Sequence, residues 1–262
     1  MDIYFWILLV GFCSIVAIGL WWRDWEPTLR VEGFRLVSDM EWIQTPLDQA
    51  ARTGNSCRIL DRFADPGLPG AIIEIVDATC ESGLPHTVGT DRIRIPKTVW
   101  NAPVERRNHV LAHERIHLLQ RRAPALWETL YREWEYTLHA EAPAGFPDAE
   151  ALRANPDTFP KPWACWRGRY WFAPLYASKE APRIQDAPTR MWDAVEKKWV
   201  PLPYEWRVRF CTERGDCPHQ DEHPAEIAAE IAADIPTTPT AAAASLRRFL
   251  DENFPEVSRS AF

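Results

Sequence analysis

Residues 109–120 read HVLAHERIHLLQ, and the apolar residues around this stretch recur at the spacing of a helix. Side chains four positions apart lie on one face of a helix, so the imidazoles of His113 and His117 can reach the same metal ion. Glu114 lies beside this pair, placed to take a proton from a metal-bound water without being a ligand. The stretch therefore predicts a helix that carries an HExxH metal-binding motif.

The helix is expected to begin at Pro103, because proline suits a first helical turn, and to end near Arg122, before Pro124. A second helix is predicted over Ala125–His139, because apolar residues recur there every four positions. These apolar residues are Leu126, Leu130, Trp134 and Leu138.

A catalytic zinc site usually has three protein ligands and one open position. No histidine follows at the spacing HExxHxxGxxH, so the third ligand must come from elsewhere in the chain. Residues 223–230 read HPAEIAAE and lie in a helix predicted over Asp221–Ile235. Glu226 and Glu230 are one turn apart on this helix, and the residues alone leave both open as the third ligand.

The remaining chain predicts strands around these helices. Upstream, Ala71–Thr79 is rich in β-branched residues and Asp91–Pro96 alternates polar and apolar residues. Downstream, an aromatic-rich insert over about 141–220 is expected to hold a strand pair at Trp163–Ala177 that turns at Arg167-Gly168, and a further strand or hairpin at Met191–Pro201. A final helix is predicted over Ala241–Asn253, after a Pro- and Thr-rich linker.

The first residues predict a membrane anchor. Ile3–Trp22 contains no charged residue and is long enough to cross a bilayer core of roughly 30 Å. A cleaved signal peptide would begin with basic residues, whereas this chain begins Met1-Asp2. We expect residues 1–25 to form a single-pass span, and the side of the membrane that holds the remaining chain stays open.

Two observations bear on that side, and they disagree. Arginines follow the span, which favours the cytoplasmic side. Cys211 and Cys217 bracket a short loop and could form a disulfide in an oxidising compartment. The alternative for all five cysteines outside the span is a buried free thiol.

Composition argues against one class of partner. The net charge is −7 and no basic stripe is present, so nucleic-acid binding is not expected. The chain has 14 tryptophans, many of them in the insert, and we interpret them mainly as packing residues, with a substrate groove as the alternative.

Several of these motifs together resemble the gluzincins, the zinc peptidases that combine HExxH with a glutamate on a downstream helix. The likeness extends to putative metallopeptidases of large DNA viruses and of environmental sequences. The matching stretches are residues 83–87 (GLPHT), 113–120, 124–134, 155–158 (NPDT) and the PxExxA element at 224–229. The resemblance implies an α+β, zincin-like domain over residues 26–235, in which a small sheet packs on the HExxH helix and on a glutamate-bearing helix. It also implies Zn²⁺ as the metal and selects Glu226 as the third ligand.

The resemblance implies a metallopeptidase in which Glu114 assists the attack of a zinc-bound water on a peptide or protein substrate, and the predicted span would anchor it to a membrane. His86, in the loop before Asp91–Pro96, is a candidate donor to the oxyanion, and Tyr204 is a second one. The free edge of the Asp91–Pro96 strand is expected to bind an extended peptide. The alternatives are a catalytically inactive zincin-fold structural or binding protein of a membrane or virion, and hydrolysis of another amide or an ester.

Overall fold

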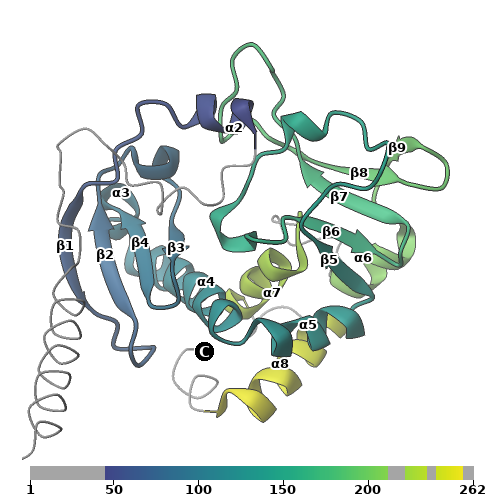
Figure 1. The fold of residues 1–262 in the computed structure, drawn as a ribbon. Coiled ribbons are helices and arrows are strands. Elements are labelled where there is room, and N and C mark those ends of the chain that lie inside the picture. The colour runs from purple at the N-terminus through teal and green to yellow at the C-terminus, as the bar shows by residue number, and fades with distance from the viewer. Residues whose placement is uncertain (1–44, 212–221, 235–239, 256–262) are drawn as a thin grey trace, which may run out of the picture. The chain divides into compact units, whose positions relative to one another are not determined.

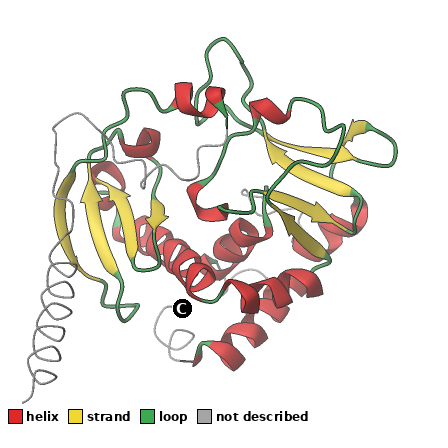
Figure 2. Ribbon diagram, in the orientation of Figure 1, coloured by secondary structure: helices red, strands yellow, loops and turns green. Residues whose placement is uncertain are grey.

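A computed structural model describes residues 45–211, 222–234 and 240–255, all of which belong to one compact unit. These residues form an α+β fold with two β-sheets and seven α-helices in the described ranges (Figure 1, Figure 2). The predicted anchor, residues 1–25, lies outside the described residues. Among the helices that are described, none has the length and apolar character needed to cross a membrane.

The first sheet has four strands in the order β1-β2-β4-β3. The strands are β1 (Ile59–Ala64), β2 (Ile72–Val76), β3 (His86–Val88) and β4 (Arg92–Pro96). β2 and β4 are parallel and pair Ile73 with Ile93, while β3 pairs with β4 in the antiparallel sense. The strands predicted at 71–79 and 91–96 are confirmed. The prediction of a free edge on β4 is wrong, because β3 covers that edge and is itself the edge strand.

The HExxH helix and the glutamate-bearing helix pack against each other between the two sheets (Figure 1). They are α4 (Val104–Arg122) and α7 (Pro224–Ala233), both predicted from the sequence. Small residues on α7 allow this close approach: Ala225, Ala228 and Ala229 are buried. The Gln120 amide donates to the Ala225 carbonyl at 2.9 Å, which joins the two helices directly.

The predicted helix over 125–139 is only partly correct. α5 spans Pro124–Glu133, and Tyr136–His139 forms strand β5 instead. The helix stops because Glu135 adopts a left-handed conformation with φ 69°. The guanidinium of Arg167 binds the Glu135 carboxylate with two bonds of 3.0 Å, so a partner 32 positions away stabilises the break.

The second sheet is antiparallel throughout, in the order β5-β6-β7-β8-β9. The further strands are β6 (Trp163–Trp166), β7 (Tyr170–Pro174), β8 (Thr189–Asp193) and β9 (Lys198–Val200). The predicted strand pair is confirmed, with its turn between β6 and β7 at Arg167-Gly168. Of the two alternatives for Met191–Pro201, the hairpin is the one that forms, from β8 and β9. Four tryptophans of this sheet are buried, which confirms the packing interpretation for them: Trp163, Trp166, Trp171 and Trp192.

Short helices complete the described part. These are α2 (Pro46–Ala51), α3 (Lys97–Trp100) and α6 (Tyr204–Phe210), together with the longer α8 (Ala241–Asn253). The bounds of α8 match the prediction, and its residues Leu246 and Leu250 lie in the same core as α4 and α7. The indole of Trp134 donates to Ser245 Oγ at 2.6 Å, which holds α8 against the end of α5.

The cysteines are partly paired. Cys57 and Cys80 form a disulfide that the sequence did not single out as a pair. Cys211 is also disulfide-bonded, and its predicted partner, Cys217, lies outside the described residues. Cys165 is a buried free thiol on β6.

Candidate metal centre

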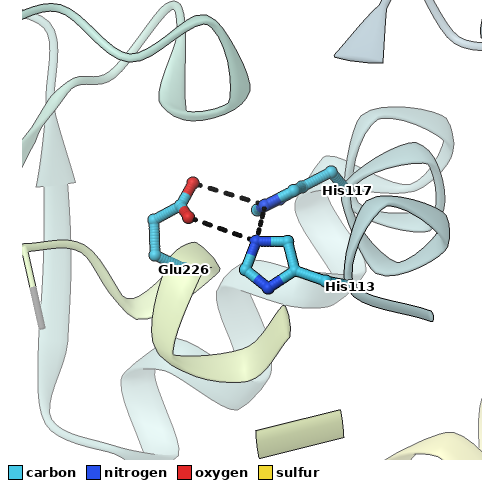
Figure 3. A group of neighbouring side chains, drawn as sticks. All are labelled: His113, His117 and Glu226. Atoms are coloured by element: carbon cyan, nitrogen blue, oxygen red, sulfur yellow. Dashed lines mark hydrogen bonds and ion pairs between the residues drawn. The ribbon is translucent and has the colours of Figure 1, made fainter. Parts of the chain in front are cut away.

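Three buried side chains converge between α4 and α7, and they are the three predicted ligands (Figure 3). His113 Nε2 lies 3.0 Å from His117 Nε2. Glu226 reaches both rings, with Oε2 at 3.4 Å from His113 Nε2 and Oε1 at 3.3 Å from His117 Nε2. The three donor atoms can therefore be shared by one metal ion.

The donor set fits zinc in chemistry and in size. Two imidazole nitrogens and one carboxylate oxygen are ligands that Zn²⁺ commonly takes. In a tetrahedral site with metal–ligand distances of about 2.0–2.2 Å, neighbouring ligand atoms lie about 3.3–3.6 Å apart. The two imidazole nitrogens are 3.0 Å apart, and the two oxygens of Glu226 lie 3.4 Å from His113 Nε2 and 3.3 Å from His117 Nε2, which is close to this range.

The second nitrogen of each ring has its own partner, which orients the ring. His117 Nδ1 lies 2.7 Å from Gln120 Oε1. His113 Nδ1 lies 3.4 Å from Glu230 Oε2. A proton on each Nδ1 leaves each Nε2 available to a metal. Glu226 faces both Nε2 atoms, whereas Glu230 lies beside Nδ1 of His113 and Nε2 of His109, so the geometry favours Glu226 as the ligand.

In the metal-free cluster, the pKa of each imidazole is raised and that of Glu226 is lowered. Burial alone would lower the pKa of both rings. Hydrogen bonds with Glu226 and Glu230 outweigh burial at His113 and raise its pKa well above the ordinary value. The charges of Glu226 and Asp157 raise the pKa of His117 to about 9. A metal ion must therefore displace protons from this cluster.

Glu114 is nearly inaccessible, 4% exposed, yet it lines a cavity of about 580 Å³ beside the ligands. Its Oε2 is buried and has no hydrogen-bond partner in the described part of the chain. Burial raises the pKa of Glu114 to about 8, with a further contribution from Asp157 and opposition from His113 and His117. A carboxyl group with an unpaired oxygen in this place is suited to exchange a proton with a molecule in the cavity.

The cavity brings together most of the residues singled out in the sequence. His113, Glu114, Glu226 and His86 all line it. His109 also lines it and is about one-third exposed, but its contacts are with Glu230 and Asp234 rather than with the ligand cluster. Tyr204 does not line the cavity and is 72% exposed on α6, so the structure gives it no place at this site.

His86 is a neutral imidazole at the edge of the first sheet. Burial lowers its pKa, and its Nδ1 lies 3.5 Å from the Leu84 carbonyl oxygen. With the proton on Nδ1, its Nε2 is an acceptor, and donation to an oxyanion would require the protonated ring or the other tautomer. His86 therefore remains a wall residue whose proposed donor role has no direct support.

His223 is the N-cap of α7. Its Nδ1 accepts from the Ala225 backbone N–H at 3.1 Å, and its Nε2 donates to the Lys161 carbonyl at 3.1 Å. Burial lowers the pKa of His223 to about 4, so the ring is neutral at pH 7. The cap fixes the start of the helix that carries Glu226.

Arg115, inside the HExxH motif, points away from the ligands and anchors α4. Its guanidinium binds the Asp65 carboxylate at 2.8 and 2.6 Å. A Cβ at Gly67 would lie 2.3–2.7 Å from atoms of this guanidinium, so a larger residue there would require the Arg115 side chain to shift. The HExxH motif therefore presents its two histidines from one face of α4 and the ion pair of Arg115 with Asp65 from the opposite face.

Two residues that touch the ligands lacked an assigned role in the sequence. Gln120 follows His117 by three positions, a spacing at which side chains on a helix meet. Asn155 donates from Nδ2 to Glu226 Oε1 at 2.9 Å across 71 positions of sequence. The residues 155–158 were noted only as part of a resemblance, and nothing in their spacing indicates contact with Glu226.

Comparison with known proteins assigns neither a family nor a function to this chain. No protein-family model matches the chain, and neither a curated protein nor a solved structure shows significant similarity to it.

Proposed function

We propose that this protein is a zinc-dependent metallopeptidase held at a membrane by residues 1–25. The observation that carries the proposal is Glu114, a buried carboxyl group with an unpaired oxygen at a cavity beside three convergent metal-ligand atoms. A structural metal site is usually closed by four ligands and has no use for such a group.

His113, His117 and Glu226 would hold the metal. Zinc bound there lowers the pKa of a coordinated water and polarises a carbonyl group. Glu114 accepts a proton from the attacking water and passes it to the leaving amine.

The arrangement of the elements supports a zincin-like fold. A sheet whose outer strand, β3, is antiparallel to β4 packs beside α4, and α7 brings the glutamate across from the other side. The substrate is expected to bind along the walls of the cavity rather than by pairing with β4. β4 has neighbours on both sides, and the Thr87 N–H of β3 already donates to Asp157 Oδ1 at 2.9 Å.

The test compares the full chain, purified in a mild detergent, with Glu114→Gln and with Glu105→Gln as a matched control. Glu105 is an exposed residue in the first turn of the same helix. We expect one zinc ion per chain in all three proteins. Loss of a general base should lower peptide cleavage by Glu114→Gln about 100-fold to 10,000-fold and leave Glu105→Gln unchanged.

The outcomes separate the proposal from its alternatives. Zinc in all three proteins without cleavage of a broad peptide library by any of them would favour a binding or structural protein. Equal cleavage by the parent and by Glu114→Gln would remove Glu114 from the chemistry. Absence of zinc from the parent would overturn the ligand assignment itself.

A further inference from the structure

The residues Asn155-Pro156-Asp157-Thr158 form a short turn that crosses between β3 and α7. Pro156–Thr158 is one turn of 3₁₀ helix, and Asn155 caps it by accepting the Asp157 backbone N–H on Oδ1 at 3.0 Å. At the β3 end, the Asp157 carboxylate accepts from both the backbone N–H and the hydroxyl of Thr87. The turn is thus fastened to the sheet edge next to the metal-ligand cluster.

The cap determines which way the Asn155 amide faces. A backbone N–H can only donate, so the atom that receives it must be the carbonyl Oδ1. Nδ2 is therefore directed to the carboxylates on the other side, at 2.9 Å from Glu226 Oε1 and 3.1 Å from Glu222 Oε1. The orientation of the amide follows from the backbone of the turn.

The backbone just before Asn155 is held as well. Ala154 donates its N–H to Asp48 Oδ1 at 3.1 Å and accepts from Arg52 Nη2 at 2.7 Å on its carbonyl. Asp48 and Arg52 are both buried on and next to α2. Asn155 is therefore fixed from both sides, which is the condition for a side chain that must set the position of another group.

We propose that Asn155 is a positioning residue of the metal centre, a role that rests on the proposed function. Its amide binds Oε1 of Glu226, which restrains rotation of the carboxylate whose two oxygens face His117 and His113. Hydrogen bonds to ligating carboxylates typically change metal affinity 10- to 100-fold when they are removed. The Asn155 amide thus prepares the third ligand before the metal arrives.

The test measures the Zn²⁺ affinity of the full chain, in detergent, by competition with a fluorescent chelator. Asn155→Ser keeps a side-chain acceptor for the turn but is too short to reach Glu226, and it adds no charge. Thr158→Val is the matched control, because it removes the 3.1 Å bond from the Thr158 hydroxyl to the Asn155 carbonyl and leaves the amide in place. Asn155→Thr, which also caps turns, replaces the serine variant if that protein does not fold.

We expect Asn155→Ser to weaken zinc binding about 10- to 100-fold and Thr158→Val to stay within about threefold of the parent. Binding by Asn155→Ser within threefold of the parent would overturn the proposal, and so would an equal loss in Thr158→Val, since the turn alone would then explain it. If the parent itself binds no zinc, the proposed function fails and this role fails with it. The zinc affinity of the parent therefore distinguishes failure of the proposed function from failure of the Asn155 role alone.

Discussion

Exchanging the two glutamates of α7 for glutamine, one at a time, tests the ligand assignment most directly. Glu226 and Glu230 lie one turn apart, and both are largely buried beside His113. They differ in the atom they face, because Glu226 reaches Nε2 of His113 and Glu230 reaches Nδ1. Glutamine matches glutamate in shape, so the two variants differ from the parent mainly in charge.

The expected magnitudes differ because the roles differ. Zinc sites with four ligands bind with roughly 10–16 kcal/mol, or about 2.5–4 kcal/mol per ligand. Glu226→Gln should therefore lose about 100-fold to 1,000-fold in zinc affinity. In the parent, the Glu230 carboxylate lies 3.4 Å from His113 Nδ1. The amide oxygen of Glu230→Gln can still accept the Nδ1–H of His113, so this variant should lose less than about tenfold in zinc affinity.

Zinc affinity is measured by chelator competition at fixed pH, and circular dichroism of the metal-free proteins checks that both variants fold. A loss in Glu230→Gln as large as that in Glu226→Gln would refute the assignment of Glu226 as the ligand. Equal, small losses in both variants would mean that neither glutamate binds the metal.

Two further predictions concern pH. The pKa values of His113 and His117 are raised, to about 9 for His117, so zinc is expected to displace one or two protons when it binds. The apparent zinc affinity should therefore fall about 10- to 100-fold for each unit by which the pH drops below about 9. Calorimetry in buffers of different ionisation enthalpy counts these protons, and release of none at pH 7 would contradict the expectation. Burial lowers the pKa of His223 to about 4 from its usual 6.5, so the folded protein holds this ring neutral. The free energy of unfolding should therefore be highest above pH 6.5 and fall by about 3 kcal/mol as the pH falls from 6.5 to 4. Urea unfolding at pH 7 and pH 4.5 should show a smaller difference for His223→Asn than for the parent.

Local sequence patterns were sufficient for the elements that carry the ligands. The periodicity and end residues of α4 and α7 placed His113, His117 and Glu226 on helices, and α8 was located to the residue. Identifying Glu226 rather than Glu230 needed a resemblance as well, because helical spacing treats the two alike. The structure separates them by the imidazole nitrogen that each carboxylate faces.

Features that depend on distant partners were not predictable. The periodicity of residues 125–139 indicated a continuous helix, but the left-handed Glu135, bound by Arg167, ends it and starts a strand. The bond from Asn155 to Glu226 joins residues 71 positions apart, and neither residue type signals the contact. Nor did spacing single out Cys57 and Cys80 as a pair across 23 positions.

The pairing of α4 with α7 also has a consequence for the order in which the protein can mature. His113 and His117 leave the ribosome more than a hundred residues before Glu226. At synthesis rates of about 5–20 residues per second, the two histidines exist for roughly 5–20 s before their third partner. The bond from Gln120 to Ala225 spans 105 positions, so closure of this helix pair is among the slow, long-range steps of folding. Metal binding at the proposed three-ligand site would consequently follow translation of the α7 region.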